Sequence, residues 1–288
     1  MKKARIMDIK HFAVHDGDGI RTTVFLKGCS LQCVWCHNPE GISFKPQLAY
    51  YRNKCIGCGE CEAVCPAGTQ KMTENGHVFD RNLCIACGKC ERECLGEALK
   101  LYGKEMTVEE LLPVLLQDRA FYETSGGGVT LSGGECLCQA DFCRELLQAL
   151  KEKGIQTAVD TCGFVPREAI DMVMPYTDVF LYDLKAMDEE VHVRCTGRPN
   201  GVILENLRYI DACGKAVEVR IPYVPDWNHD QMEKMAAFLK SLKNVRAVKV
   251  LAYHNYAGSK YDALGMENTM PGVLPREEEI QKAQALFD

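Results

Sequence analysis

Residues 28–38 read Gly-Cys-Ser-Leu-Gln-Cys-Val-Trp-Cys-His-Asn and place Cys29, Cys33 and Cys36 on one short loop. The loop offers three thiolates, whereas a structural zinc site or an ordinary 4Fe-4S cluster takes four protein ligands. Either a distant cysteine supplies the fourth ligand, or one metal position stays open for a substrate. The aromatic Trp35 beside the third cysteine favours the open position.

Two further cysteine runs follow, each with the Cys-x2-Cys-x2-Cys-x3-Cys spacing of bacterial ferredoxins. Pro66 ends the first run, as in that pattern, whereas Leu95 follows the second. Because the fourth cysteine of each ferredoxin run ligates the other cluster, the runs predict two 4Fe-4S clusters. One is assigned to Cys55, Cys58, Cys61 and Cys94, and the other to Cys84, Cys87, Cys90 and Cys65. A pair of zinc knuckles is the disfavoured alternative.

The composition sets the context for these runs. The chain has 288 residues, 47% of them hydrophobic, which is enough for one full core and a small extra module. Its 17 cysteines, without a signal-peptide pattern, predict a cytoplasmic protein of an anaerobe. The net charge of -6, without a basic cluster, argues against nucleic acid as a partner, and no apolar stretch is long enough to predict a membrane span.

Short apolar segments alternate with amphipathic ones outside the cysteine-rich stretch. The predicted strands are 22–26, 129–132, 156–160, 179–183, 216–221 and 246–252, and the predicted helices are 139–153, 166–173, 204–213, 230–242 and 276–287. Strands followed by helices indicate a parallel sheet. With only six strands evident, we expect an α/β fold: an incomplete (β/α)6 TIM-type barrel over residues 1–50 and 101–288, with a ferredoxin-like insert over residues 51–100.

The three-cysteine loop resembles the cluster loop of the radical S-adenosylmethionine (SAM) enzymes. In that superfamily the amino and carboxylate groups of SAM chelate the open iron. The residue beside the third cysteine, here Trp35, packs near the adenine. The resemblance predicts a third 4Fe-4S cluster, on Cys29, Cys33 and Cys36, with SAM as its substrate.

Polar motifs follow the other predicted strands and converge on one rim of the barrel, where barrel enzymes build their sites. The glycines of Gly133-Gly134-Glu135 expose backbone for the SAM amino group, which Glu135 can fix. Lys185 can neutralise the SAM carboxylate, and His254 can contact the ribose. The candidate SAM-binding residues are Trp35, Gly133, Gly134, Glu135, Asp160, Asp183, Lys185, Arg220 and His254. Each of these residues also has a purely structural explanation that does not involve SAM: a turn, a helix cap, a surface charge or a core histidine.

Together these residues resemble a narrower family, the glycyl radical enzyme activating enzymes that carry a ferredoxin-like insert. The match includes Asp16-Gly17-Asp18-Gly19-Ile20-Arg21, the cluster loop through Glu40, and Asp183-Leu184-Lys185. It implies reductive cleavage of SAM to methionine and a 5'-deoxyadenosyl radical, which abstracts a hydrogen from a glycine of a large partner enzyme. It also implies a monovalent cation on Asp160, Thr161 and Asp183.

Two positions depart from the family pattern: Asp18 replaces a usual Pro, and Cys136 replaces the Pro that usually follows Gly-Gly-Glu. Asp16 and Arg21 are candidates for docking the partner's glycine loop. We expect ferredoxin or flavodoxin to supply electrons, relayed by the insert clusters, although those clusters could instead shape the partner surface. The alternatives are a radical SAM enzyme for a small molecule or peptide and, less favoured, a simple electron carrier. The sequence does not select the partner enzyme.

Overall fold

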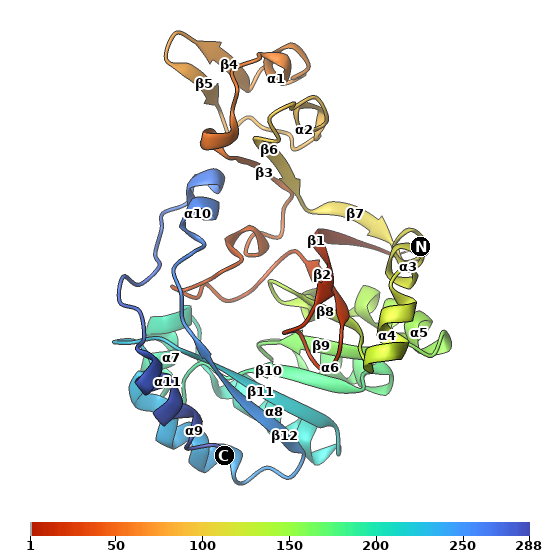
Figure 1. The fold of residues 1–288 in the computed structure, drawn as a ribbon, viewed down its shortest axis with the longest axis vertical. Coiled ribbons are helices and arrows are strands. Elements are labelled where there is room, and N and C mark those ends of the chain that lie inside the picture. The colour runs from red at the N-terminus through yellow and green to blue at the C-terminus, as the bar shows by residue number, and fades with distance from the viewer. Residues whose placement is uncertain (1) are drawn as a thin grey trace.

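The computed structural model describes residues 2–288. Within them, one eight-stranded sheet has the order β12-β11-β10-β9-β8-β2-β1-β7 (Figure 1). Neighbouring strands from β2 to β12 pair in parallel, and β1 and β7 add an antiparallel edge. The strands are β1 (Lys3–Ala13), β2 (Arg21–Leu26), β7 (Lys104–Thr107), β8 (Gly128–Gly133), β9 (Gln156–Thr161), β10 (Val179–Asp183), β11 (Ala216–Tyr223) and β12 (Val245–Ala252). All six predicted strands are confirmed, whereas β1 and β7 were not predicted.

Helices join the strands and follow the last of them. Between β7 and β12 they are α3 (Val108–Leu116), α4 (Arg119–Ser125), α5 (Ala140–Glu152), α6 (Arg167–Val173), α7 (Glu189–Thr196), α8 (Gly201–Ala212) and α9 (Met232–Leu239). After β12 come α10 (Gly258–Leu264) and α11 (Glu277–Gln284). The five predicted helices correspond to α5, α6, α8, α9 and α11. Helix α5 buries Phe142, Leu146 and Leu150 along one face, and Gly154 ends it at a φ of 74°.

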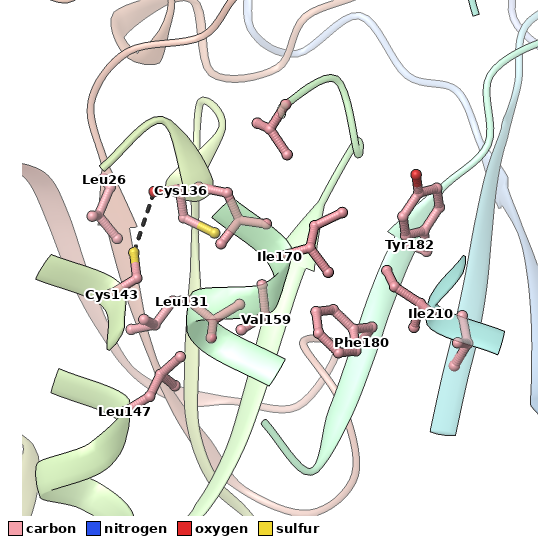
Figure 2. Packing of buried hydrophobic residues seen from close by; sticks show 14 of the residues in the cluster. Leu26, Leu131, Cys136, Cys143, Leu147, Val159, Ile170, Phe180, Tyr182 and Ile210 are labelled. Carbon is pink, nitrogen blue, oxygen red and sulfur yellow. Dashed lines mark hydrogen bonds between the residues drawn. The ribbon is translucent and has the colours of Figure 1, made fainter. Parts of the chain in front are cut away.

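The main core lies between the sheet and these helices. Leu131, Val159 and Phe180 stand side by side on β8, β9 and β10 and are fully buried. Figure 2 shows them facing Leu147 of α5 and Ile170 of α6. Because both faces of a parallel sheet are covered, these strands are buried along almost their whole length, and their short runs of apolar and β-branched residues are why the sequence predicted them.

The sheet does not close into a full barrel, because β12 and β7 occupy its two edges in the described chain. The β1–β2 loop, residues 14–20, reaches from one side of this opening to the other. Asp18 of the loop pairs with Arg246 of β12 at 2.9 Å, and Asp16 lies 3.6 Å from Arg220 of β11. The incomplete barrel expected from the sequence is therefore confirmed as a parallel α/β architecture with an open side.

The cysteine-rich stretch forms a separate projection above the sheet (Figure 1). Its elements are β3 (Gln47–Tyr50), α1 (Glu60–Ala63), β4 (Gln70–Thr73), β5 (Gly76–Phe79), α2 (Lys89–Arg92) and β6 (Leu99–Tyr102). The second three elements repeat the first three at one constant offset, which is also the offset from Cys55 to Cys84. The halves exchange strands, because β3 pairs with β6 and β4 with β5. Assignment of this module as a two-cluster ferredoxin-like domain stays a prediction.

Candidate functional site

The three-cysteine loop follows β2 and is held by backbone hydrogen bonds. The Gly28 N–H donates to the Gly41 carbonyl at 2.8 Å, and the Cys29 N–H donates to the Ile42 carbonyl at 3.1 Å. Gly28 has a φ of 111°, and Phe44 fills the space where a Cβ would stand, so this position requires glycine. The loop thereby presents Cys29, Cys33 and Cys36 to one cavity of about 520 Å³.

The predicted rim residues line the same cavity, with one exception. The structure brings together Trp35, Gly133, Gly134, Asp160, Thr161, Asp183, Lys185, Arg220 and His254 around the three cysteines. They come from the carboxyl ends of β8 to β12 or the turns that follow, and Trp35 from the cluster loop itself. Convergence of strand ends is the arrangement expected of a site on a barrel rim.

Glu135 is the exception, because its carboxylate is used inside the fold. It is 1% exposed and accepts hydrogen bonds from the Thr161 hydroxyl at 2.8 Å and from the Cys162 N–H at 2.8 Å. Its own N–H donates to the Gly28 carbonyl at 2.8 Å. Glu135 therefore ties the cluster loop to the end of β9, and its predicted direct contact with SAM stays a prediction.

Charged groups on the cavity wall are arranged in pairs. Lys185 donates to Asp183 at 2.8 Å, and Arg220 lies 3.2 Å from Asp160. Burial raises the pKa of Asp160 to about 6 in spite of the guanidinium beside it. Burial acts to lower the pKa of Lys185, but the Asp183 carboxylate overrides this and keeps the pKa above its usual range. Lys185 therefore remains a fixed positive charge in the wall.

One buried polar atom of the cavity wall, Nδ1 of His254, has neither a hydrogen-bond nor an ion-pair partner within residues 2–288. The His254 ring stacks on His37 with centroids 4.0 Å apart, which fixes its orientation at the mouth. Because buried polar groups normally find partners, this nitrogen indicates a polar ligand in the cavity. Three thiols, paired charges and a flat aromatic wall suit a cluster with SAM across it.

The cysteines of the projecting module gather in two groups of four. One small cavity is lined by Cys55, Cys58, Cys61 and Cys94, and a second by Cys65, Cys84, Cys87 and Cys90. Each group combines three cysteines of one run with the last cysteine of the other. Within residues 2–288, no group of three or more His, Cys, Asp or Glu side chains is close enough together to hold a single metal ion.

Backbone conformation in the two groups repeats at the same offset. Gly59 and Gly88 both have positive φ, of 81° and 73°, at the start of α1 and α2. Behind the first group, Nε2 of His77 donates to the side-chain carbonyl of Gln70 at 2.7 Å and lies 3.6 Å from the Cys61 thiol. The two groups therefore occupy equivalent, preformed pockets, which fit a larger inorganic group bound by four thiolates.

The predicted role of Arg21 in docking the partner's glycine loop is wrong, because the side chain is buried in the fold. Its side chain is 0% exposed and donates to the Thr130 hydroxyl at 2.7 Å and to the Val129 carbonyl at 2.9 Å. Arg21, Val129 and Gln156 all lie at the starts of their strands, at the opposite end of the sheet from the cluster loop. Arg21 therefore has a structural role and offers no surface to a partner protein.

Asp16 lies differently. Its carboxylate accepts from the Thr23 hydroxyl at 2.7 Å and faces Arg220, and the neighbouring His15 lines the main cavity. Its proposed contact with a partner glycine loop stays a prediction. The sequence analysis missed His15, His37 and Cys162, all of which line this cavity. Their positions in the sequence, beside motif residues that end strands or follow them, could have indicated that they line the cavity.

Comparisons with known proteins find a matching family model and similar proteins. A family model described as the radical SAM superfamily matches residues 23–239. The chain is 42% identical to the trans-4-hydroxy-L-proline dehydratase activating enzyme of Clostridioides difficile, over 98% of this chain and 95% of that protein. It is 41% identical to the choline trimethylamine-lyase activating enzyme of Oleidesulfovibrio alaskensis, over 94% of this chain and 90% of that protein. A domain of a pyruvate-formate lyase-activating enzyme from Bacteroides vulgatus is 31% identical, covers 56% of this chain and 92% of its own, and has a TM-score of 0.47.

Within residues 2–288, no helix is both long and apolar enough for a membrane span.

Proposed function

Because the chain belongs to the radical SAM superfamily and, within it, to the glycyl radical enzyme activating enzymes, we propose a role for each part of its site. The chain is an enzyme that cleaves SAM and generates a radical on a partner glycyl radical enzyme. When bound on the three-cysteine loop, the reduced 4Fe-4S cluster supplies the electron that splits SAM into methionine and a 5'-deoxyadenosyl radical. The protein's own residues bind, orient and shield the reactants.

One observation carries the assignment: Cys29, Cys33 and Cys36 share a cavity with the strand-end residues of β8 to β12. Gly133 and Gly134 present backbone to the SAM amino group, and Lys185 neutralises its carboxylate. The unpartnered Nδ1 of His254 is available for a polar group of SAM. Asp160, Thr161 and Asp183 lie together on the cavity wall and are the residues that would hold a monovalent cation.

The projecting module runs from β3 to β6 and so extends slightly beyond the predicted insert of residues 51–100; in this proposal it holds two further 4Fe-4S clusters. The grouping of Cys94 with the first run and of Cys65 with the second supports it. We assign these clusters to electron relay from an external ferredoxin or flavodoxin to the SAM cluster.

Helix α10 supports the relay, because it contacts both the module and the cluster loop. The Arg81 guanidinium donates to the Ala263 carbonyl at 2.8 Å, and the Cys84 N–H donates to the Arg81 carbonyl at 3.3 Å. On the other side of the helix, the Tyr261 hydroxyl donates to the Cys36 carbonyl at 3.0 Å. The cluster of Cys84, Cys87, Cys90 and Cys65 is therefore the inner one of the two in this proposal.

The test combines two products. The enzyme is reconstituted anaerobically with its clusters, reduced and given SAM, and it should release 5'-deoxyadenosine and methionine. It should also leave a glycyl radical on a candidate partner glycyl radical enzyme, detected by electron paramagnetic resonance (EPR). Cys36→Ala should abolish both products, whereas Cys213→Ala, at an exposed cysteine outside every group, should abolish neither.

Each alternative predicts a different result. SAM cleavage without a radical on any partner protein would favour a small-molecule or peptide substrate. Electron transfer without SAM cleavage would favour a simple carrier. The relatives activate enzymes with different substrates, so the identity of the partner is settled by testing candidates and not by similarity.

A further inference from the structure

The two cysteine groups of the projecting module occupy equivalent pockets but differ in the polar groups around them. We call the group of Cys84, Cys87, Cys90 and Cys65 the inner group, and the group of Cys55, Cys58, Cys61 and Cys94 the outer group. The two halves of the module repeat at one constant offset along the chain. Each residue beside the inner group can therefore be compared with its equivalent beside the outer group.

The segment after the last cysteine of each run shows the first difference. The N–H and the hydroxyl of Thr69 contact the Cys65 sulfur at 3.3 and 3.2 Å, and the hydroxyl can only donate to a ligating thiolate. The equivalent of Thr69 is Ala98, whose N–H donates to the Cys94 sulfur at 3.2 Å. Alanine has no hydroxyl, so the inner group receives a donor that the outer group lacks.

A side-chain amide gives the inner group a second additional donor. Gln70 is 1% exposed, and its amide nitrogen donates to the Cys90 sulfur at 3.7 Å. Nε2 of His77 donates to the Gln70 side-chain carbonyl at 2.7 Å, which directs the amide nitrogen toward Cys90. The same Nε2 lies farther from the Cys61 sulfur of the outer group, at 3.6 Å, so its proton serves Gln70. The equivalent of Gln70 is Leu99, whose side chain has no donor.

Two smaller differences act in the same direction. The Ala86 N–H donates to the Cys84 sulfur at 3.4 Å, which adds a backbone hydrogen bond to the inner group. Helix α1, which carries Cys61, has two carboxylates and no cation, whereas α2, which carries Cys90, has two cations and one carboxylate (Figure 1). Solvent and salt screen exposed charges, so the hydrogen bonds contribute the larger part of the difference.

We infer that Thr69 and Gln70 raise the reduction potential of the inner cluster above that of the outer cluster. The inference rests on the proposed function, because it requires a 4Fe-4S cluster on each group. Hydrogen bonds to the ligating sulfurs stabilise the reduced, more negatively charged cluster and so raise its potential. One electron then leaves the outer cluster, which is oxidised, and enters the inner cluster, which is reduced, and no bond or proton is exchanged. Electrons from the external donor therefore collect on the side of the module that contacts α10.

The experiment is a redox titration of the loaded, full-length enzyme, followed by EPR. The variants Thr69→Ala and Gln70→Leu replace each donor by its equivalent from the other half. In the wild type, the inner cluster should hold the electron about tenfold more often than the outer one, a midpoint difference of about 59 mV for one electron. Each variant should lower this preference several-fold, and the double variant should abolish it. The same titration with Cys29, Cys33 and Cys36 all replaced by Ala identifies the signals of the module.

Two control variants separate the effect on potential from an effect on structure. Thr69→Ser keeps the hydroxyl and should keep the wild-type potentials. Thr73→Ala removes a hydroxyl that donates to the Gly76 carbonyl in the same hairpin and lines neither cysteine pocket, so it should change neither potential. If Gln70→Leu fails to bind its clusters, the comparison of Thr69→Ala with Thr69→Ser decides the question.

Equal midpoints of the two clusters in the wild type would overturn the inference and leave the clusters themselves in place. A midpoint difference that Thr69→Ala leaves unchanged would also overturn it. A chain that binds iron on the three-cysteine loop alone would instead overturn the proposed function of the module, and the inference with it.

Discussion

Arg21→Ala should destabilise the whole fold and should not act selectively on the partner enzyme. The side chain is fully buried and donates to Thr130, Val129, Asp18 and Gln156. Its removal leaves buried acceptors without their charged donor and opens a cavity, so we expect a loss of about 3–5 kcal/mol. Since 1 kcal/mol corresponds to roughly 2–4 °C in a chain of this size class, the unfolding midpoint should fall by roughly 10 °C.

The assay is anaerobic thermal unfolding of the loaded enzyme, followed by SAM cleavage and partner activation below the midpoint of the variant. Both activities should fall in the same proportion. Arg246→Ala is the control: its side chain is 35% exposed and pairs with Asp18, which is 60% exposed, so it should cost no more than about 1 kcal/mol. An unchanged midpoint in Arg21→Ala, with partner activation lost and SAM cleavage kept, would show that this structural explanation is wrong.

Three further predictions test the cofactors and the site. Anaerobic reconstitution should give about twelve iron atoms per chain, and replacing Cys29, Cys33 and Cys36 together by Ala should remove about four; a zinc-filled protein would contradict this. Cys94→Ser should damage the cluster of Cys55, Cys58 and Cys61 while SAM cleavage with a strong artificial reductant survives, and loss of that cleavage would show that the module does more than deliver electrons. Gly163→Ala should lower stability and SAM binding far more than Gly214→Ala, because both glycines have positive φ but only Gly163 has the Tyr182 hydroxyl where a Cβ would stand. Similar unfolding midpoints for these two variants would exclude the Tyr182 clash as the cause.

The sequence predicted the parallel strands and most strand-end residues because both depend on local pattern. Short apolar runs mark buried strands, and polar residues directly after them mark the rim. Strand β7 (Lys104–Thr107) escaped prediction because it is a short, polar edge strand. Burial of Arg21 was also invisible, since its partners Thr130 and Gln156 are distant in sequence and meet it only in the folded sheet.

The position of Glu135 illustrates the same limit. A motif can show that a carboxylate follows two glycines, but the direction of that carboxylate depends on Thr161 and Cys162 from the next strand. The cysteine groupings were more predictable, because ferredoxin spacing encodes the exchange of the fourth ligand.

The antiparallel pairing of β3 with β6 has a consequence for how such a protein can change over time. Tyr50 at the end of β3 lies opposite Leu99 at the start of β6, so the chain leaves the barrel and returns to it at neighbouring points. A short turn could join these residues directly, and the path of the barrel chain would be preserved. The intervening segment could therefore be gained or lost without changing the path of the barrel chain. Because its two halves exchange both strands and cysteines, neither half completes a group of four cysteines alone, and we expect related chains to carry the segment whole or not at all.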